Sequence, residues 1–123
     1  MKYIKASDIK KQIDLLIKSL DLKYINKKNI HCIRSFDAKT RAYARIWGMA
    51  KIFSEVVGIE PHYIIEVNAN RYDKLSEREK IKTLVHELLH IPKTFSGALL
   101  SHRGKGRRIN DTEIEKIIRN LKK

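Results

Sequence analysis

Hydrophobic and polar positions follow the most regular pattern in the second half of the chain. Apolar residues recur there every three or four positions, the spacing of one helix face: Ile81, Leu84, Val85, Leu88 and Leu89. Ser76 followed by Glu79 fits a capping box, so the helix is predicted to begin near Glu77. Pro92 disfavours helical geometry at the residue before it, so the helix should end near His90. The apolar face should anchor this helix in a core, and the opposite face should look into a cleft.

The same spacing predicts two further helices. The first has Ser7 as its expected N-cap, and its apolar face is formed by Ile9, Ile13, Leu16, Ile17 and Leu20. The second runs from about Thr112 to Leu121, and its inward face is formed by Ile114, Ile117, Ile118 and Leu121. Both helices are therefore expected to cover a shared core with one side.

Strands are predicted between the helix capped by Ser7 and the helix that begins near Glu77. Ile30 to Phe36 and His62 to Asn68 are rich in β-branched and aromatic residues. Ala42 to Phe53 could be another strand or could pass into a short helix, because Gly48 weakens either interpretation. Two aromatic residues of this segment are expected in the core: Trp47 and Phe53. The order of elements predicts a small α+β fold, with a short sheet packed against the three helices.

The clearest chemical signal is the run His86 to His90, which reads HELLH and is an instance of HExxH. On a helix, residues four positions apart share a face, so His86 and His90 can bind one metal ion. Glu87 then lies where it can act as a general base on a water at that ion. Two imidazole ligands and a carboxylate base are typical of zinc hydrolases. By chance the motif would occur in under ~1% of chains of this length.

A catalytic zinc usually has three protein ligands and one open position. His102 is the favoured third ligand, because a turn around Pro92 to Gly97 could bring it back to the helix. Asp111 and Glu113 are alternatives, but both are expected in the cap and first turn of the last helix. Glu66, in a predicted strand, is a weaker candidate. The expected cofactor is one zinc ion per chain.

The run HELLHIPKTFSG followed by His102 resembles the phage and archaeal metallopeptidase domain, a small group of zincins. More distantly it is similar to SprT-like metalloproteases, in which a distant third histidine follows HExxH. The resemblance extends from about Tyr43 to about His102. It implies a zinc ion bound by His86, His90 and His102, with Glu87 as base. It also implies a zincin fold in which the strand before the active-site helix borders the cleft.

Composition narrows the class of protein. The chain has 123 residues, of which 42% are hydrophobic, so we expect one small domain over residues 1–123 with a real core. No apolar run approaches the ~20 residues that span a membrane, so a cytoplasmic protein without membrane association is expected. Cys32 is the only cysteine, which excludes an intrachain disulfide, and it should pack as a small hydrophobic residue.

The charge is strongly positive. There are 27 basic and 14 acidic residues, giving a net charge of +13, which indicates a polyanionic partner such as nucleic acid. A local cluster directly follows the expected third ligand and is the candidate nucleic-acid contact: Arg103, Lys105, Arg107 and Arg108. The alternative is an ordinary solvated loop, because charge alone is unspecific.

These observations favour a zinc-dependent peptidase that acts on proteins or peptides, including proteins associated with nucleic acid. A metal-dependent nuclease is one alternative, although no acidic cluster for a second metal is apparent. A non-catalytic, zinc-stabilised nucleic-acid-binding module is another, although intact Glu87 argues against it. A peptide is expected to pair with the free edge of the strand from His62 to Asn68. Candidate donors to an oxyanion are Tyr63, Tyr72 and Arg103.

Overall fold

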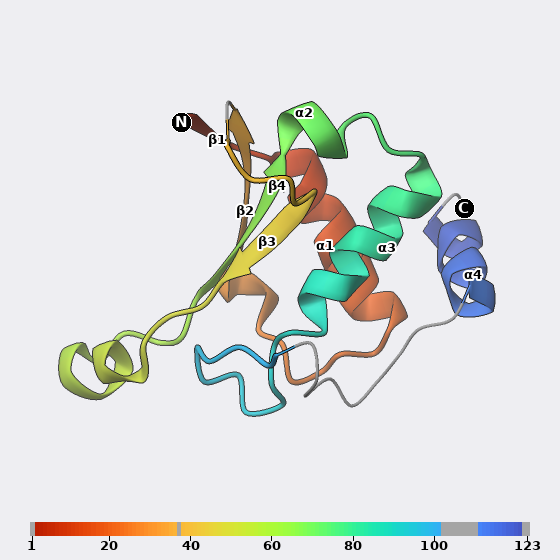
Figure 1. Cartoon of the computed structure of the whole chain (residues 1–123). Coiled ribbons are helices and arrows are strands. Elements are labelled where there is room, and N and C mark those ends of the chain that lie inside the picture. Colours follow the sequence, from red (N-terminus) through yellow and green to blue (C-terminus); the bar gives the residue numbers. More distant parts are fainter. Residues whose placement is uncertain (1, 37, 102–110, 122–123) are drawn as a thin grey trace.

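The computed structural model describes residues 2–36, 38–101 and 111–121 of the chain. A mixed sheet of four strands carries the helices on one of its faces (Figure 1), which confirms the predicted α+β class. The strands are β1 Lys2–Lys5, β2 Ile30–Phe36, β3 Ala44–Trp47 and β4 Tyr63–Asn68. The α-helices are α1 Ser7–Ser19, α2 Ala69–Tyr72, α3 Glu77–Leu88 and α4 Asp111–Leu121. Shorter helical segments are the 3-10 helix η1 Lys27–Asn29 and the π-helix η2 Phe53–Val57.

The sheet has the strand order β1-β2-β4-β3, so β4 is central and β3 forms one edge. Strand β4 pairs parallel with β2 and antiparallel with β3. The prediction that the segment from His62 to Asn68 has a free edge is therefore wrong. The ambiguous segment from Ala42 to Phe53 contributes β3, which covers the edge of β4. Strand β1 was not predicted, because all four of its positions are exposed and show no alternating burial.

The core lies between the sheet and the helices. Alternate residues of β4 point into it and are fully buried: Tyr63, Ile65 and Val67. The predicted apolar face of α1 is confirmed, since all of its members are buried: Ile9, Ile13, Leu16, Ile17 and Leu20. Helix α4 packs on α3 and α1 through Ile114, Ile117 and Ile118. The buried, free Cys32 fits its predicted role, and burial raises the pKa of its thiol to about 12.

Two details at helix ends differ from prediction. The N-cap of α1 is Ala6, and Ser7 is its first helical residue. The backbone N–H of Ala6 donates to the Cys32 carbonyl at 3.0 Å, so Ala6 still pairs with the sheet and the helix begins directly after it. Helix α3 begins at Glu77 as predicted, with the Ser76 hydroxyl accepting from the backbone N–H of Glu79 at 3.2 Å. It ends at Leu88, two residues before the predicted end.

Two aromatic residues that were predicted in the core, Trp47 at the end of β3 and Phe53 after it, are exposed, so this prediction is wrong. Trp47 is 45% exposed and Phe53 is 51% exposed. Trp47 lies on the edge strand, where its indole N–H donates to Glu66 at 2.9 Å. Phe53 belongs to an arm, residues 48–62, that projects away from the sheet and contains η2 (Figure 1). The prediction rested on the hydrophobicity of the two side chains alone. Trp47 lies on an edge strand and Phe53 on the projecting arm, so neither reaches the core.

Candidate metal centre

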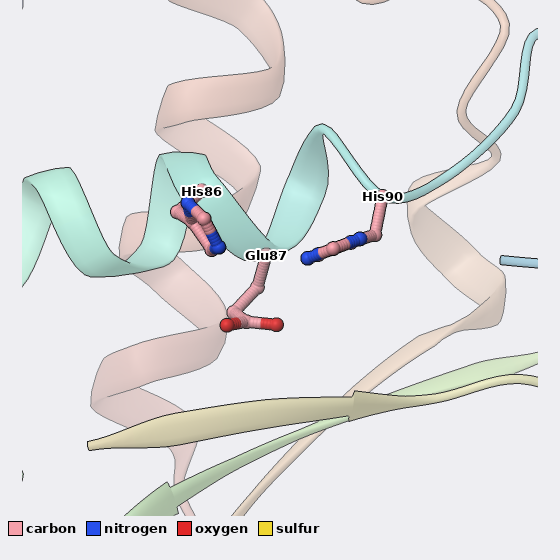
Figure 2. Close-up of side chains that lie close together, drawn as sticks. All are labelled: His86, Glu87 and His90. Atoms are coloured by element: carbon pink, nitrogen blue, oxygen red, sulfur yellow. The ribbon is translucent and has the colours of Figure 1, made fainter. Parts of the chain in front are cut away.

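Three side chains with metal-binding chemistry meet at the end of α3. His86 and Glu87 belong to its last turn, and His90 follows two residues after the helix ends. One ligand atom from each residue lies within 4.8 Å of the others. Figure 2 shows the Glu87 carboxylate between the two imidazoles, directed toward β3. Two imidazoles and a carboxylate at this separation are a donor set that fits one divalent transition metal ion.

The three side chains line a pocket of about 520 Å³. Its opposite wall is formed by the edge strand β3 and by Ala42, and Leu99 and Leu100 complete its lining. His86 is exposed, whereas Glu87 and His90 are only 7% and 8% exposed. The strand that borders the site is thus β3, and not the strand directly before the active-site helix as the resemblance implied. Sequence patterns did not predict this wall, because an edge strand of four residues is recognised only by its pairing.

The ring of His90 has a fixed orientation. Its Nδ1 lies 2.5 Å from the carbonyl oxygen of Leu100. Because a carbonyl only accepts hydrogen bonds, Nδ1 must carry the proton, which leaves Nε2 with its lone pair for a metal. The backbone N–H of Leu100 in turn donates to the His90 carbonyl at 2.7 Å. The loop that follows α3 therefore sets both the tautomer and the direction of one candidate ligand.

That loop is itself held by a buried tyrosine and a glycine pair. The Tyr63 hydroxyl accepts from the backbone N–H of Gly97 and donates to the Ala98 carbonyl, both at 2.8 Å. The N–H of Met49 donates to the Gly97 carbonyl at 2.8 Å. A Cβ added at Gly48 would lie 2.3 Å from the Gly97 oxygen, and one at Gly97 would lie 2.3 Å from the Met49 oxygen. We call these contacts the Tyr63 clamp; sequence reasoning missed it because its partners are far apart in the chain.

Neither of the two described candidates for an oxyanion donor, Tyr63 and Tyr72, lines the pocket. The Tyr63 side chain is fully buried, and its hydroxyl is committed to the clamp. Burial raises the pKa of this phenol, and the hydrogen bond from Gly97 lowers it in part. Tyr72 is also fully buried, and it does not line the pocket. Arg103 lies outside the described residues.

Glu66, the weaker candidate for a third ligand, has another role. Its carboxylate is 1% exposed and accepts hydrogen bonds from Arg45 Nε at 3.0 Å and from Trp47 Nε1 at 2.9 Å. Burial raises the pKa of Glu66, but the bonds from Arg45 and Trp47 outweigh it, so the net shift is downward. Strand alternation places Glu66 on the face opposite the buried Ile65, away from the helices. It therefore does not join the group at α3.

The remaining predicted site residues lie outside the described part of the chain. This holds for His102, the favoured third ligand, and for the predicted nucleic-acid contacts Arg103, Lys105, Arg107 and Arg108. Helix α4 does begin at Asp111, but the side chains of Asp111 and Glu113 are also outside the described set. These assignments stay predictions.

The whole chain was compared with known proteins. The family model described as "Putative phage metallopeptidase" matches residues 1–120. The chain belongs to this phage metallopeptidase family. The match is longer than the predicted stretch from Tyr43 to His102, because it includes α1 and most of α4. No curated protein and no solved structure matches the chain.

The family is described as one of metal-dependent peptidases, which implies a metal ion and a protein or peptide substrate. The group at the end of α3 is where the described residues could hold that ion. Across the described residues, no helix has the length and apolar character needed to cross a membrane.

Proposed function

We propose that this protein is a zinc-dependent peptidase of the HExxH type. His86 and His90 are the proposed zinc ligands, and Glu87 is the proposed general base. The observation that carries the proposal is the convergence of these three side chains within 4.8 Å, in a pocket beside an edge strand. When bound, zinc would act as a Lewis acid: it would lower the pKa of a coordinated water toward ~7 and offset the negative charge that develops on the substrate carbonyl oxygen.

The chain's own residues supply the proton transfers and the orientation. The Glu87 carboxylate points into the pocket and can take a proton from the attacking water, then pass it to the leaving amine. The Leu100 carbonyl accepts from Nδ1 of His90, so Nε2 is the nitrogen that would bind the ion. His102 stays the proposed third ligand, on the strength of its place in the sequence after HELLH. Zinc is preferred over harder cations because imidazole nitrogen is the main donor.

Substrate is proposed to bind along β3. Among the described residues, this strand pairs only with β4, so its other edge offers backbone groups beside the pocket. An extended peptide can add to such an edge as a further strand, which would bring its backbone past Glu87. The binding strand is thus β3, in place of the strand first predicted.

The alternatives have less support. A two-metal nuclease needs a second cluster of acidic ligands, and within the described ranges only the group at α3 brings three metal-binding side chains together. A zinc-stabilised module without catalysis would not need the Glu87 carboxylate in the pocket. The net charge of +13 supports acidic substrates, or substrates associated with nucleic acid.

The proposal is tested with Glu87→Gln. This substitution keeps the size of the side chain and removes the base, so zinc content should stay at the wild-type level. Peptide cleavage should fall by about 100-fold or more. Glu77→Gln, an exposed position in the first turn of the same helix, is the matched control and should cleave normally. Normal cleavage by Glu87→Gln in a protease-free preparation would rule out the proposed base.

A further inference from the structure

A second pocket continues along the same edge of the molecule. It has a volume of about 600 Å³ and lies between the segment 38–43, helix α2 and the connection from α2 to α3. Tyr43 lines this pocket, whereas its neighbours Ala42 and Ala44 line the candidate metal centre. The two pockets therefore adjoin where β3 begins, so a strand bound along β3 would reach both.

The second pocket is cationic. Three exposed basic side chains line it: Lys39, Arg71 and Lys74. In the ranges that the structure describes, no acidic side chain lines it, and none of the three cations forms an ion pair. Elsewhere, by contrast, Arg34 and Arg45 are paired with carboxylates. The positive charge of this pocket is thus not compensated by the described part of the protein.

The neutral polar groups of the pocket stabilise its walls. Asn68 Nδ2 donates to the Thr40 carbonyl at 3.3 Å, and Asn68 Oδ1 accepts from the N–H of Asn70 at 3.1 Å. The Thr40 hydroxyl accepts from the N–H of Ala42, and the N–H of Asn68 donates to the Tyr43 carbonyl. Because these groups are used within the protein, an incoming ligand would meet mainly the three cations, the half-exposed ring of Tyr43 and the exposed side chain of Asn70.

We propose that this pocket, named the cationic subsite, binds an acidic side chain of the substrate on the C-terminal side of the cleaved bond. The inference rests on the proposed peptidase function. A substrate that pairs antiparallel with β3, the slightly more stable arrangement, has its C-terminal part beside the start of β3. Tyr43 lies one to three positions before the β3 residues that line the metal centre, and paired strands advance residue by residue, so the acidic residue would lie roughly two to four positions after the cleaved bond.

The size and place of the subsite favour a peptide over a nucleic-acid strand. The charge of three cations around one pocket is suited to one or two carboxylate groups. A single-stranded nucleic acid needs a longer cationic track, with sites of roughly 4 to 16 nucleotides in known binding folds. The subsite is also continuous with the proposed path of the substrate along β3, where a peptide backbone is already expected.

The experiment compares pairs of peptides that differ only by Glu or Gln at each of the positions after the cleaved bond. The zinc-loaded wild type should cleave the Glu peptide about tenfold more efficiently at one of these positions, as expected for two or three exposed ion pairs. The test variant combines Lys39→Gln, Arg71→Gln and Lys74→Gln. The control, with the same loss of charge at exposed sites elsewhere, combines Lys11→Gln, Lys18→Gln and Lys116→Gln.

The test variant should cleave the two peptides with equal efficiency, whereas the control should keep the preference for the Glu peptide. Cleavage by the wild type with no preference, or with a preference that survives in the test variant, would overturn the subsite and leave the peptidase proposal standing. Absence of any cleavage would contradict the peptidase proposal itself.

A binding measurement decides the subsite without catalysis. Fluorescence anisotropy with Glu87→Gln protein should show tighter binding of the labelled Glu peptide than of the Gln peptide, and the difference should vanish when the three cations are neutralised. A labelled single-stranded oligonucleotide is the competing ligand. If it binds through these three cations and the Glu peptide does not displace it, the pocket serves nucleic acid and the proposal is wrong.

Discussion

Two irregular segments meet beside the candidate metal centre. One is held by several hydrogen bonds to the rest of the fold, whereas the other leaves most of its side chains exposed. The loop from Ile91 to Ser101 is fixed by the Tyr63 clamp and by paired bonds between His90 and Leu100. The arm, residues 48–62, touches this loop at its base, and its π-helical segment η2 has no buried residue. Apolar side chains there stay exposed, including Ile52 at 59% and Val56 at 73%.

The difference shows which of the two segments must hold a fixed conformation for the metal centre to form. An error in the loop would move His90, and a misplaced ligand weakens a metal site by a large factor. Beyond Met49, the arm supplies no residue of the Tyr63 clamp and none of the pocket lining, so its conformation matters less to the metal centre. Substitutions in the loop should therefore cost far more than substitutions in this outer part of the arm.

Gly97→Ala should be the most damaging single change. The new Cβ would lie 2.3 Å from the Met49 carbonyl oxygen, and the backbone φ of +96° is unfavourable for any residue with a side chain. We expect a loss of about 2–4 kcal/mol in the free energy of unfolding, measured by urea denaturation. Gly58→Ala in the arm is the matched control, since its φ is +78° but no atom lies within 4 Å. It should cost only about 1 kcal/mol. Equal costs at the two glycines would contradict the account of the clamp.

Tyr63→Phe tests whether the Tyr63 hydroxyl positions His90 in addition to stabilising the fold. The substitution leaves the Gly97 N–H and the Ala98 carbonyl without their buried partner, which should cost about 1–3 kcal/mol of stability. Because the loop orients His90, zinc affinity should also fall by about tenfold, measured by competition with a chelator on folded protein. Tyr3→Phe, at a half-exposed tyrosine of β1, should change neither quantity. Unchanged zinc affinity in Tyr63→Phe would mean that the clamp stabilises the fold alone.

Acidification should destabilise the protein in two ranges of pH. His31 is largely exposed but partly desolvated, which lowers its pKa below 6.5, and the nearby charges of His62 and two lysines lower the pKa further. A depressed pKa means that the unfolded state binds more protons, so the stability from this group is present above pH 6.5 and is lost as the pH falls through the folded pKa. The same sign applies to Glu66 below pH 4.5. Melting temperature against pH should therefore fall in both ranges, and His31→Gln should flatten the upper one only.

Phe53→Ser in the arm should have the smallest effect. The side chain is half-exposed, and η2 buries none of its residues, so the free energy of unfolding should change by no more than about 0.5 kcal/mol. Zinc affinity should be unchanged. A loss above about 1.5 kcal/mol in urea denaturation would show that the arm is packed in solution and would remove the contrast with the loop.

Local patterns were sufficient to predict the elements that carry the chemistry. The capping box at Ser76 located the start of α3, and the HELLH spacing placed His86, Glu87 and His90 together. Both depend on residues within four positions of one another, where the helix and the turn that directly follows it set the distance.

Contacts between distant segments could not be predicted in this way. The edge strand β3 is defined by its pairing with β4, which lies beyond the whole arm in the sequence, and the clamp joins Tyr63 to a loop 34 residues later. The exposure of Trp47 was missed for a related reason. A large apolar side chain is expected inside, and only the strand order, which places β3 at an edge of the sheet, shows why Trp47 is exposed.

The most direct measurement is the zinc content of the folded protein by elemental analysis, with each variant checked by circular dichroism. We predict one zinc per chain in the wild type and in His31→Ala, which removes an exposed histidine far from α3 in the sequence. His86→Ala and His90→Ala should lose the ion or bind it far more weakly. Folded wild-type protein that takes up no zinc, or zinc retained at full affinity in both variants, would contradict a metal centre at the end of α3.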